Sequence, residues 1–212
     1  GDGSHLLYAC GFPHQKQPKT IPAHAVVKRL QRMYEQFQPH AAVCEELFHV
    51  RNAELHSGST RLNEMHESAW LGRFYGAVIS MTEILGRSLE ELLAPEEAAH
   101  ARALAAAAAE ENKKEVMDRI SSSRKTFDAL PADEQVQKRT RMAAALAYRP
   151  SAPCPACGSA AALTGFIVSE SRPHYTEGLY VERVYAVESL RCLACNLELR
   201  GVAECAAGGV QP

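Results

Sequence analysis

Pro153-Cys154-Pro155-Ala156-Cys157-Gly158 contains the first of two closely spaced cysteine pairs, and these pairs determine how the carboxyl-terminal part of this chain folds. A Cys-x-x-Cys pair brings two thiolates within reach of one metal ion, and Gly158 permits the turn after the second cysteine. A second pair of this kind follows at residues 192–195. Two such pairs complete the shell of a tetrahedral site. We therefore expect one Zn²⁺ to be bound by Cys154, Cys157, Cys192 and Cys195.

The second cysteine pair lies between two segments that alternate in hydrophobicity like β-strands, residues 183–191 and 197–202. Residues 152–205 therefore resemble a zinc ribbon, in which two knuckles sit on β-hairpins. A closed shell of cysteines leaves no position for water, so we expect a structural ion rather than a catalytic one. Redox-active or incidental pairs are the alternative, but neither pair has the strand-to-helix context of a thioredoxin-like site. Cys205 has no partner by spacing, and we interpret it as a spare thiol.

The composition restricts the class of protein. The chain has 212 residues and 7 cysteines, and an odd number of cysteines argues against a secreted disulfide scaffold. No apolar run approaches the roughly 20 residues that span a bilayer, so we expect a cytoplasmic protein with no membrane association. Lysine and arginine total 23 against 25 acids, so any basic surface must be local. The first residue is not methionine, which leaves open that the chain is a fragment of a longer protein.

Before residue 150 the sequence is patterned as amphipathic helices. Apolar residues recur every three or four positions, which indicates one buried face per helix. We predict helices over about 22–37, 39–58 and 67–85, with Gly58 and Gly86 as helix ends. Three such helices in succession predict a bundle over residues 22–95, preceded by an extension over 1–21. The predicted buried faces are Val26, Val27, Leu30, Tyr34 and Phe37, then Val43, Leu47, Val50 and Leu55, and then Trp70, Phe74, Val78, Met81 and Leu85.

A longer helical region follows, which we treat as an extension over residues 96–150 before the ribbon at 151–212. Ser88 and Glu91 have the spacing of a capping box, and Pro95 suits the first turn of a long helix through the alanine run 105–109. We predict a break at 121–123 or at 130–131. Residues 111–150 carry nine basic and six acidic residues, which fits either a solvated helix face or a surface that follows phosphates.

Arg51-Asn52-Ala53-Glu54-Leu55-His56 lies at the end of the second predicted helix. Cleavage of RNA without a metal needs a base for the 2′-hydroxyl proton and a permanent cation for the transition state, roles that His56 and Arg51 fit. Five helical residues separate them by about 7.5 Å in rise and about 140° in azimuth, so we expect a composite site across two subunits. Asn52 is suited to hydrogen-bond the phosphate or to orient His56 of the neighbouring chain.

This hexapeptide resembles the Arg, four to six residues, His signature of the HEPN superfamily, including its common Asn after the Arg. The apolar helix that precedes it and the following helix with Trp70, Phe74 and Tyr75 agree with HEPN bundles. The resemblance implies a mainly α fold, a HEPN-like helical bundle followed by a small β zinc-ribbon module. It also implies a metal-independent endoribonuclease of defence or toxin type that acts on RNA as a homodimer, with Arg51, Asn52 and His56 as catalytic residues.

Further partners follow from the same resemblance. A protein partner or antitoxin is expected to restrain such a nuclease, and the ribbon is expected to recognise a target or a partner. One HEPN subgroup carries a tyrosine two positions after the histidine as a nucleotidylation target; here that position is Gly58, so we do not expect regulation by that route. The competing interpretation is a non-catalytic dimeric adaptor that binds nucleic acid or protein through its ribbon.

Overall fold

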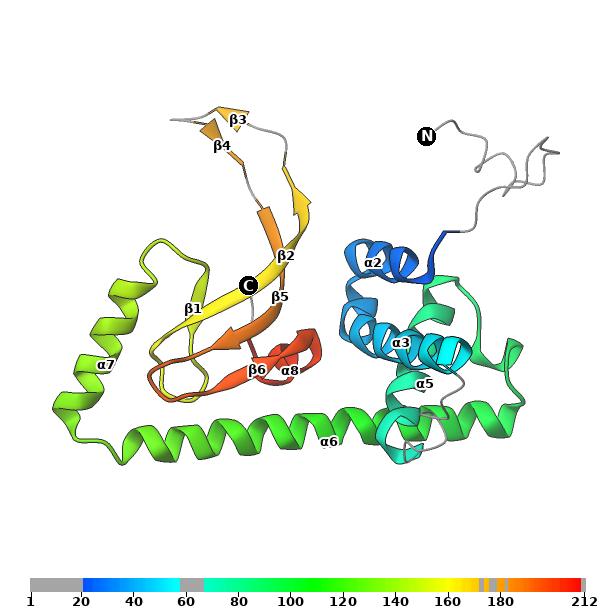
Figure 1. Cartoon of the computed structure of the whole chain (residues 1–212), viewed down its shortest axis with the longest axis horizontal. Helices are drawn as coiled ribbons and strands as arrows, with labels where there is room; N and C mark the ends of the chain where they lie inside the picture. The colour runs from blue at the N-terminus through cyan, green and yellow to red at the C-terminus, as the bar shows by residue number, and fades with distance from the viewer. Residues whose placement is uncertain (1–20, 58–66, 172–173, 176–178, 182, 211–212) are drawn as a thin grey trace.

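A computed structural model of the chain describes residues 21–57, 67–171, 174–175, 179–181 and 183–210. The protein is mainly helical, with a small antiparallel sheet in its carboxyl-terminal part (Figure 1). A helical bundle lies at one end of a long helix, and the sheet lies along the rest of it. The expected combination of a helical part and a small β module is therefore confirmed.

The bundle is formed by α2 (Ala23–Met33), the 3₁₀ helix η1 (Glu35–His40), α3 (Ala41–Ser57) and α5 (Glu67–Ile84). The first helix ends earlier than predicted, because Tyr34 has an extended backbone with φ −132°. Pro39 lies inside η1 and does not start α3 as we expected. The bend at Tyr34 still carries Phe37 into the core, where its side chain is fully buried.

The core of the bundle is built from the faces that the apolar periodicity predicted, with three corrections. Leu55 is 64 % exposed because it lies about 120° around α3 from the buried Val43. Leu85 is 73 % exposed because it follows the last residue of α5, and Val26 is 40 % exposed because it points about 100° away from Val27. The buried cluster is Val27, Phe37, Ala41, Val43, Cys44 and Ala77, against which Leu30, Tyr34, Leu47, Met81 and Ile84 pack.

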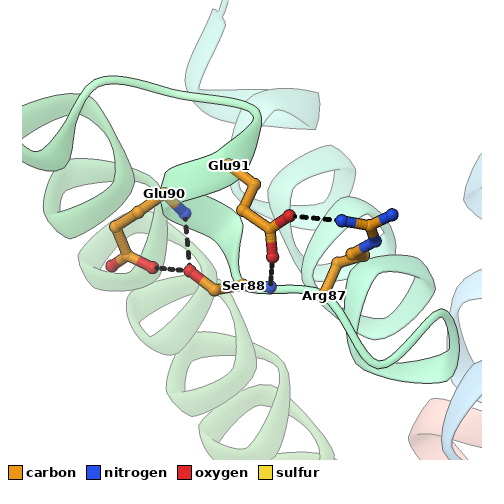
Figure 2. A network of polar contacts seen from close by, with 4 residues as sticks. All are labelled: Arg87, Ser88, Glu90 and Glu91. Atoms are coloured by element: carbon orange, nitrogen blue, oxygen red, sulfur yellow. Dashed lines mark hydrogen bonds and ion pairs between the residues drawn. The ribbon is translucent and has the colours of Figure 1, made fainter.

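The junction after α5 confirms the predicted capping box (Figure 2). Gly86 ends the helix with φ +64°, a conformation that glycine adopts without strain. The backbone N–H of Ser88 donates to Glu91 Oε1 over 3.0 Å, and Ser88 Oγ accepts from the Glu90 N–H over 3.2 Å. Glu91 also pairs with Arg87 Nη1 at 2.8 Å. The box caps η2 (Leu89–Glu91), a 3₁₀ turn, rather than the long helix itself.

The long helix is α6 (Pro95–Asp128), and Pro95 occupies its first turn as predicted. It continues through residues 121–123 without interruption. The break falls at the second predicted place, between Leu130 and Pro131, after which α7 (Ala132–Ala145) folds back beside the sheet. Ala98 and Ala101 of α6 are buried against Tyr75, Val78 and Ile79 of α5, so the start of α6 belongs to the bundle.

The sheet has the strand order β1-β2-β5-β6, with every neighbouring pair antiparallel. Its strands are β1 (Ser151–Pro153), β2 (Ala160–Glu170), β5 (Arg183–Arg191) and β6 (Glu198–Arg200), and a separate pair is formed by β3 (His174–Tyr175) and β4 (Leu179–Tyr180). The predicted hairpins around the two cysteine pairs are therefore present. The predicted strand over 197–202 is shorter, because Gly201 turns the chain with φ +79° into α8 (Gly201–Ala207).

One apolar core joins the ribbon to the helices that precede it. Val116, Ile120 and Phe127 of α6 and Met142 of α7 are buried in the same cluster as Leu190 and the metal-site cysteines. The second half of α6 and Met142 of α7 therefore form one wall of the ribbon's core. Sequence patterning assigned these helices to an extension and could not show what covers them.

Candidate metal centre and the arginine and histidine motif

The four cysteines of the two knuckles meet at one point. Each offers its Sγ atom, all four atoms lie within 4.8 Å of one another, and all four side chains are buried. Cys154 Sγ is 3.6 Å from Cys195 Sγ, and Cys157 Sγ is 3.6 Å from Cys192 Sγ. Thiolates around a tetrahedral zinc, with Zn–S near 2.3 Å, are about 3.8 Å apart. The cysteine cluster can therefore hold a metal ion, and its donor set fits Zn²⁺.

The backbone of each knuckle is closed by hydrogen bonds and by one residue with positive φ. In the first, the Cys154 N–H donates to Ser159 O over 2.8 Å, and Gly158 has φ +71°. In the second, the Cys192 N–H donates to Leu197 O over 2.9 Å, and Asn196 has φ +60°. Asparagine is one of the few residues besides glycine that tolerates this conformation. The two pairs therefore have equivalent turns, although only Gly158 identified one from the sequence.

The thiols perturb one another. Hydrogen bonds from Cys192 and Cys195 lower the pKa of Cys154 to about 4. The same contact with Cys154, followed by that with Cys192 and by burial, raises the pKa of Cys195 above its ordinary range. A metal ion displaces protons from the thiols that bind it, so metal affinity has to fall as the pH is lowered.

Two arginines from the helices fix the first knuckle. Arg124 of α6 donates from Nε to Ala156 O over 3.1 Å and from Nη2 to Pro155 O over 2.9 Å. Arg139 of α7 donates from Nη2 to Cys157 O over 3.2 Å. Three consecutive carbonyls of the knuckle are therefore held by guanidinium groups. We call Arg124 and Arg139 the arginine clasp.

Sequence reasoning did not find the arginine clasp. Both residues were counted in the basic stretch 111–150, for which a solvated face and a phosphate surface were the alternatives. The contacts join residues 31, 32 and 18 positions apart, and no local pattern marks them. Arg119 in the same stretch also turns to the ribbon, where its Nη2 lies 2.8 Å from Glu204 Oε2.

Cys205 lies outside the metal cluster, as expected. It is buried in α8 within the core shared by the ribbon and helices. Burial and, to a lesser degree, the charge of Glu204 raise the pKa of its thiol to about 11. Cys205 therefore stays protonated at neutral pH and acts as a small apolar core residue.

Arg51, Asn52 and His56 lie in the last two turns of α3, and the side chains of all three are exposed. Arg51 Nη1 donates a long hydrogen bond of 3.5 Å to Asn52 Oδ1. Within the described part of the chain, no hydrogen bond or ion pair joins Arg51 to His56, in keeping with their separation of about 140° around the helix. Gly58, the predicted end of this helix, lies outside the described residues.

A hollow of about 530 Å³ lies between α2 and α3 beside the motif, and we call it the α2–α3 hollow. Arg51 and Asn52 line it, whereas His56 does not. The packing of α2 against α3 brings further polar side chains to the same place, and no sequence signal marked them. The remaining lining residues are Pro22, Ala23, His24, Lys28, Glu45, Phe48 and His49.

Comparison of the chain with protein-family models, with curated proteins and with solved structures finds no match. Function must therefore be inferred from the residues and their geometry. In the described ranges, no helix combines the length and the apolar character needed to cross a membrane.

Proposed function

We propose that this chain is a metal-independent endoribonuclease of HEPN type that acts in the cytoplasm as a homodimer, with a structural zinc ribbon that contacts the target RNA or a protein partner. The observation that carries the proposal is the position of Arg51, Asn52 and His56. All three are exposed in the final turns of one helix, and Arg51 and Asn52 also line a hollow that contains a second cation, Lys28.

The proposed chemistry assigns one role to each group. His56 takes the proton from the 2′-hydroxyl of the substrate, and the resulting oxygen attacks the adjacent phosphorus. Arg51 stabilises the added negative charge on the phosphoryl oxygens, while Asn52 donates a hydrogen bond to one of them. The P–O5′ bond breaks and the leaving 5′-oxygen takes up a proton from water, while His56 returns to solvent the proton that it accepted; the products are a 2′,3′-cyclic phosphate and a 5′-hydroxyl. DNA lacks the attacking hydroxyl and is not cut.

The geometry of α3 favours a site made from two protomers. Arg51 and His56 of one helix project in directions about 140° apart and do not converge on one phosphate. Leu55, the apolar residue next to His56, is 64 % exposed and does not line the α2–α3 hollow. An exposed apolar residue next to the motif suits contact with a second copy, which brings Arg51 of one chain to His56 of the other.

The zinc centre has a supporting role in this proposal. Cys154, Cys157, Cys192 and Cys195 would hold Zn²⁺ between the β1–β2 and β5–β6 hairpins, and a shell of four cysteines would leave no open position for a substrate. The arginine clasp fixes the first knuckle against α6 and α7. The ribbon is then a rigid platform for recognition of RNA or of a protein such as an antitoxin.

The test is cleavage of a labelled single-stranded RNA without added Mg²⁺, together with identification of the product ends. Arg51→Ala and His56→Ala should each reduce the rate at least about 100-fold, because acid–base catalysis contributes that much or more. His100→Ala and Arg141→Ala remove exposed residues of the same types from α6 and α7 and should leave the rate unchanged. Equal activity of all four variants, or absence of cyclic phosphate ends, would refute the proposal.

A second candidate function is a non-catalytic adaptor, and one surface favours it. Ile167 of β2 and Tyr185 of β5 are cross-strand neighbours and are exposed together. An apolar patch on a sheet suits contact with a protein. If the chain is an adaptor, Arg51→Ala and His56→Ala would leave binding of the protein partner unchanged, whereas Tyr185→Ser would abolish it.

A further inference from the structure

We propose that the α2–α3 hollow is a strand-binding subsite, in which Lys28 holds a phosphate of single-stranded RNA next to the scissile one and Phe48 stacks on a base. This inference rests on the proposed ribonuclease function and deepens it. It assigns residues of α2, which carries no part of the Arg-x₄-His motif, to substrate binding. The adjoining Arg51 and Asn52 make the hollow continuous with the proposed catalytic residues.

Charge is the first observation that supports the subsite. The whole chain has a net charge of −2, yet the hollow collects the cations Lys28 and Arg51 against the single carboxylate of Glu45. Among the residues that the structure describes, neither Lys28 nor Arg51 forms a salt bridge, unlike Arg73, Arg87, Arg102 and Arg119. Cations that lack a carboxylate partner and face one concave surface attract a polyanion.

Size and shape are the second observation. A volume of about 530 Å³ lies within the range of sites that bind small organic ligands, so the hollow has room for one nucleotide unit. The Phe48 ring lines it and is 36 % exposed. Exposed aromatic rings beside cations are the elements by which proteins hold single strands without reading their sequence. The subsite is therefore expected to tolerate any base and to prefer unpaired RNA.

The lysine and the ring also have suitable positions. Lys28 comes from the second turn of α2, and Phe48 and Arg51 come from adjacent turns of α3. A strand in the hollow is thus bound by two helices and leads directly to Arg51. Positioning of this kind lowers the KM for longer RNA and has less effect on a dinucleotide, which has no second phosphate to place.

The experiment measures binding of a fluorescent RNA oligonucleotide in which every 2′-hydroxyl is methylated, so that it binds but cannot be cut. Fluorescence anisotropy over a range of salt concentrations gives the dependence of log K on log [salt]. Loss of one phosphate contact to a single strand makes this slope shallower by about 0.7. We expect that change for Lys28→Ala and no change for Arg29→Ala, an exposed neighbour on α2 that does not line the hollow.

Phe48→Leu keeps an apolar side chain but removes the ring. It should weaken binding by about tenfold or more and leave the salt slope unchanged, because stacking contributes affinity without neutralising charge. Circular dichroism of each variant checks that the fold is retained. An equal change of slope in Lys28→Ala and Arg29→Ala would contradict the subsite proposal. Displacement of the RNA by polyglutamate at equal charge concentration would also contradict it and would indicate an acidic protein partner.

Failure of the subsite and failure of the proposed nuclease give different results. If cleavage requires His56 but RNA binding does not depend on Lys28 or Phe48, the subsite proposal is wrong and the nuclease proposal stands. If RNA binding depends on Lys28 and Phe48 but unmodified RNA is not cleaved, the subsite proposal stands and the nuclease proposal is wrong. An unmodified RNA substrate of ten nucleotides and a dinucleotide complete the test, since Lys28→Ala should raise KM only for the longer one.

Discussion

At the scale of single residues, the first knuckle shows how a metal centre is supported by groups that do not bind the metal. The carbonyls of Pro155, Ala156 and Cys157 accept hydrogen bonds from the arginine clasp. Arg139 also lies over the Phe127 ring, with its Cζ 5.2 Å from the ring centroid. These contacts orient the knuckle from outside the cysteine cluster.

Arg124→Gln is expected to lower the stability of the zinc-loaded protein by about 1–2 kcal/mol, because two hydrogen bonds from a charged donor are lost. Arg124→Lys should recover little of this, since an ammonium group cannot reproduce the planar fork. Urea unfolding monitored by circular dichroism measures the difference in free energy of unfolding between each variant and the wild type. Lys114→Gln, an exposed site on the same helix, is the matched control; an equal effect there would show that the clasp adds no stability.

Residues whose contacts lie within a few positions along the chain could be predicted from the sequence. Residues whose contacts are with distant segments could not. Cysteine spacing predicted the metal ligands, and Gly158 predicted the turn behind them, because each depends on the chain within a few positions. Arg124 and Lys28 are ordinary exposed-looking cations in helices until a distant segment packs beside them. No single sequence contains that information without the tertiary fold.

At the scale of elements, the connection between α5 and α6 is the most closely specified. Gly86 ends one helix, the Ser88 box closes η2, and Pro95 starts the next. Arg102 of α6 reaches back to η2, where its Nη1 lies 2.6 Å from Glu90 Oε1. The hydrogen bond from Arg102, followed by that from Ser88, lowers the pKa of Glu90 from 4.5 to about 2.

Because the pKa of Glu90 is lowered in the folded state, the ionised carboxylate stabilises the fold. A carboxyl whose pKa is lower in the folded state stabilises the fold above its ordinary pKa, and this contribution is lost as the pH falls from about 4.5 towards about 2. Glu90→Gln should therefore lower Tm slightly at pH 7, and the difference from the wild type should shrink as the pH falls below about 4.5 and disappear only below about pH 2. Thermal scans against Glu111→Gln, an exposed glutamate of α6, test this; a difference that does not vary with pH would contradict it.

Helix existence was predictable from apolar periodicity, but helix ends often were not. Val27, Leu30 and Val43 identified buried faces correctly because periodicity reports directly on burial. The bend at Tyr34 and the start of α8 after Gly201 depend on how the chain meets other elements, and their local sequence allows continuation. The β-hairpins were predictable because the cysteine pairs fix their turns.

At the scale of the whole molecule, two cores share one helix. The bundle core packs against the start of α6, and the ribbon core contains Val116, Ile120 and Phe127 from its second half. Met142 and Leu146 extend the ribbon core into the segment around α7. These helices therefore form part of the core of the ribbon, which a division by composition near residue 150 does not reveal.

Removal of zinc should therefore loosen more than the ribbon. Chelation is expected to increase amide hydrogen exchange over residues 116–146 as well as 151–210, because both line the core around the cysteines. Amides of α3 and of α5 should keep their protection, since their core contains no metal ligand. Cys154→Ser with Cys195→Ser should reproduce the pattern without a chelator. Exchange confined to residues 151–210 would show that the helices hold together without the metal.

The unbroken course of α6 gives the molecule a fixed internal measure. Its 34 residues extend about 51 Å as one rod, with no proline or glycine after the first turn to act as a hinge. If the ribbon grips a structured RNA feature while the bundle cuts, the scissile bond must lie at a constant offset from that feature. Inserting whole helical turns into α6 would then shift the cleavage position along the RNA by a corresponding number of nucleotides.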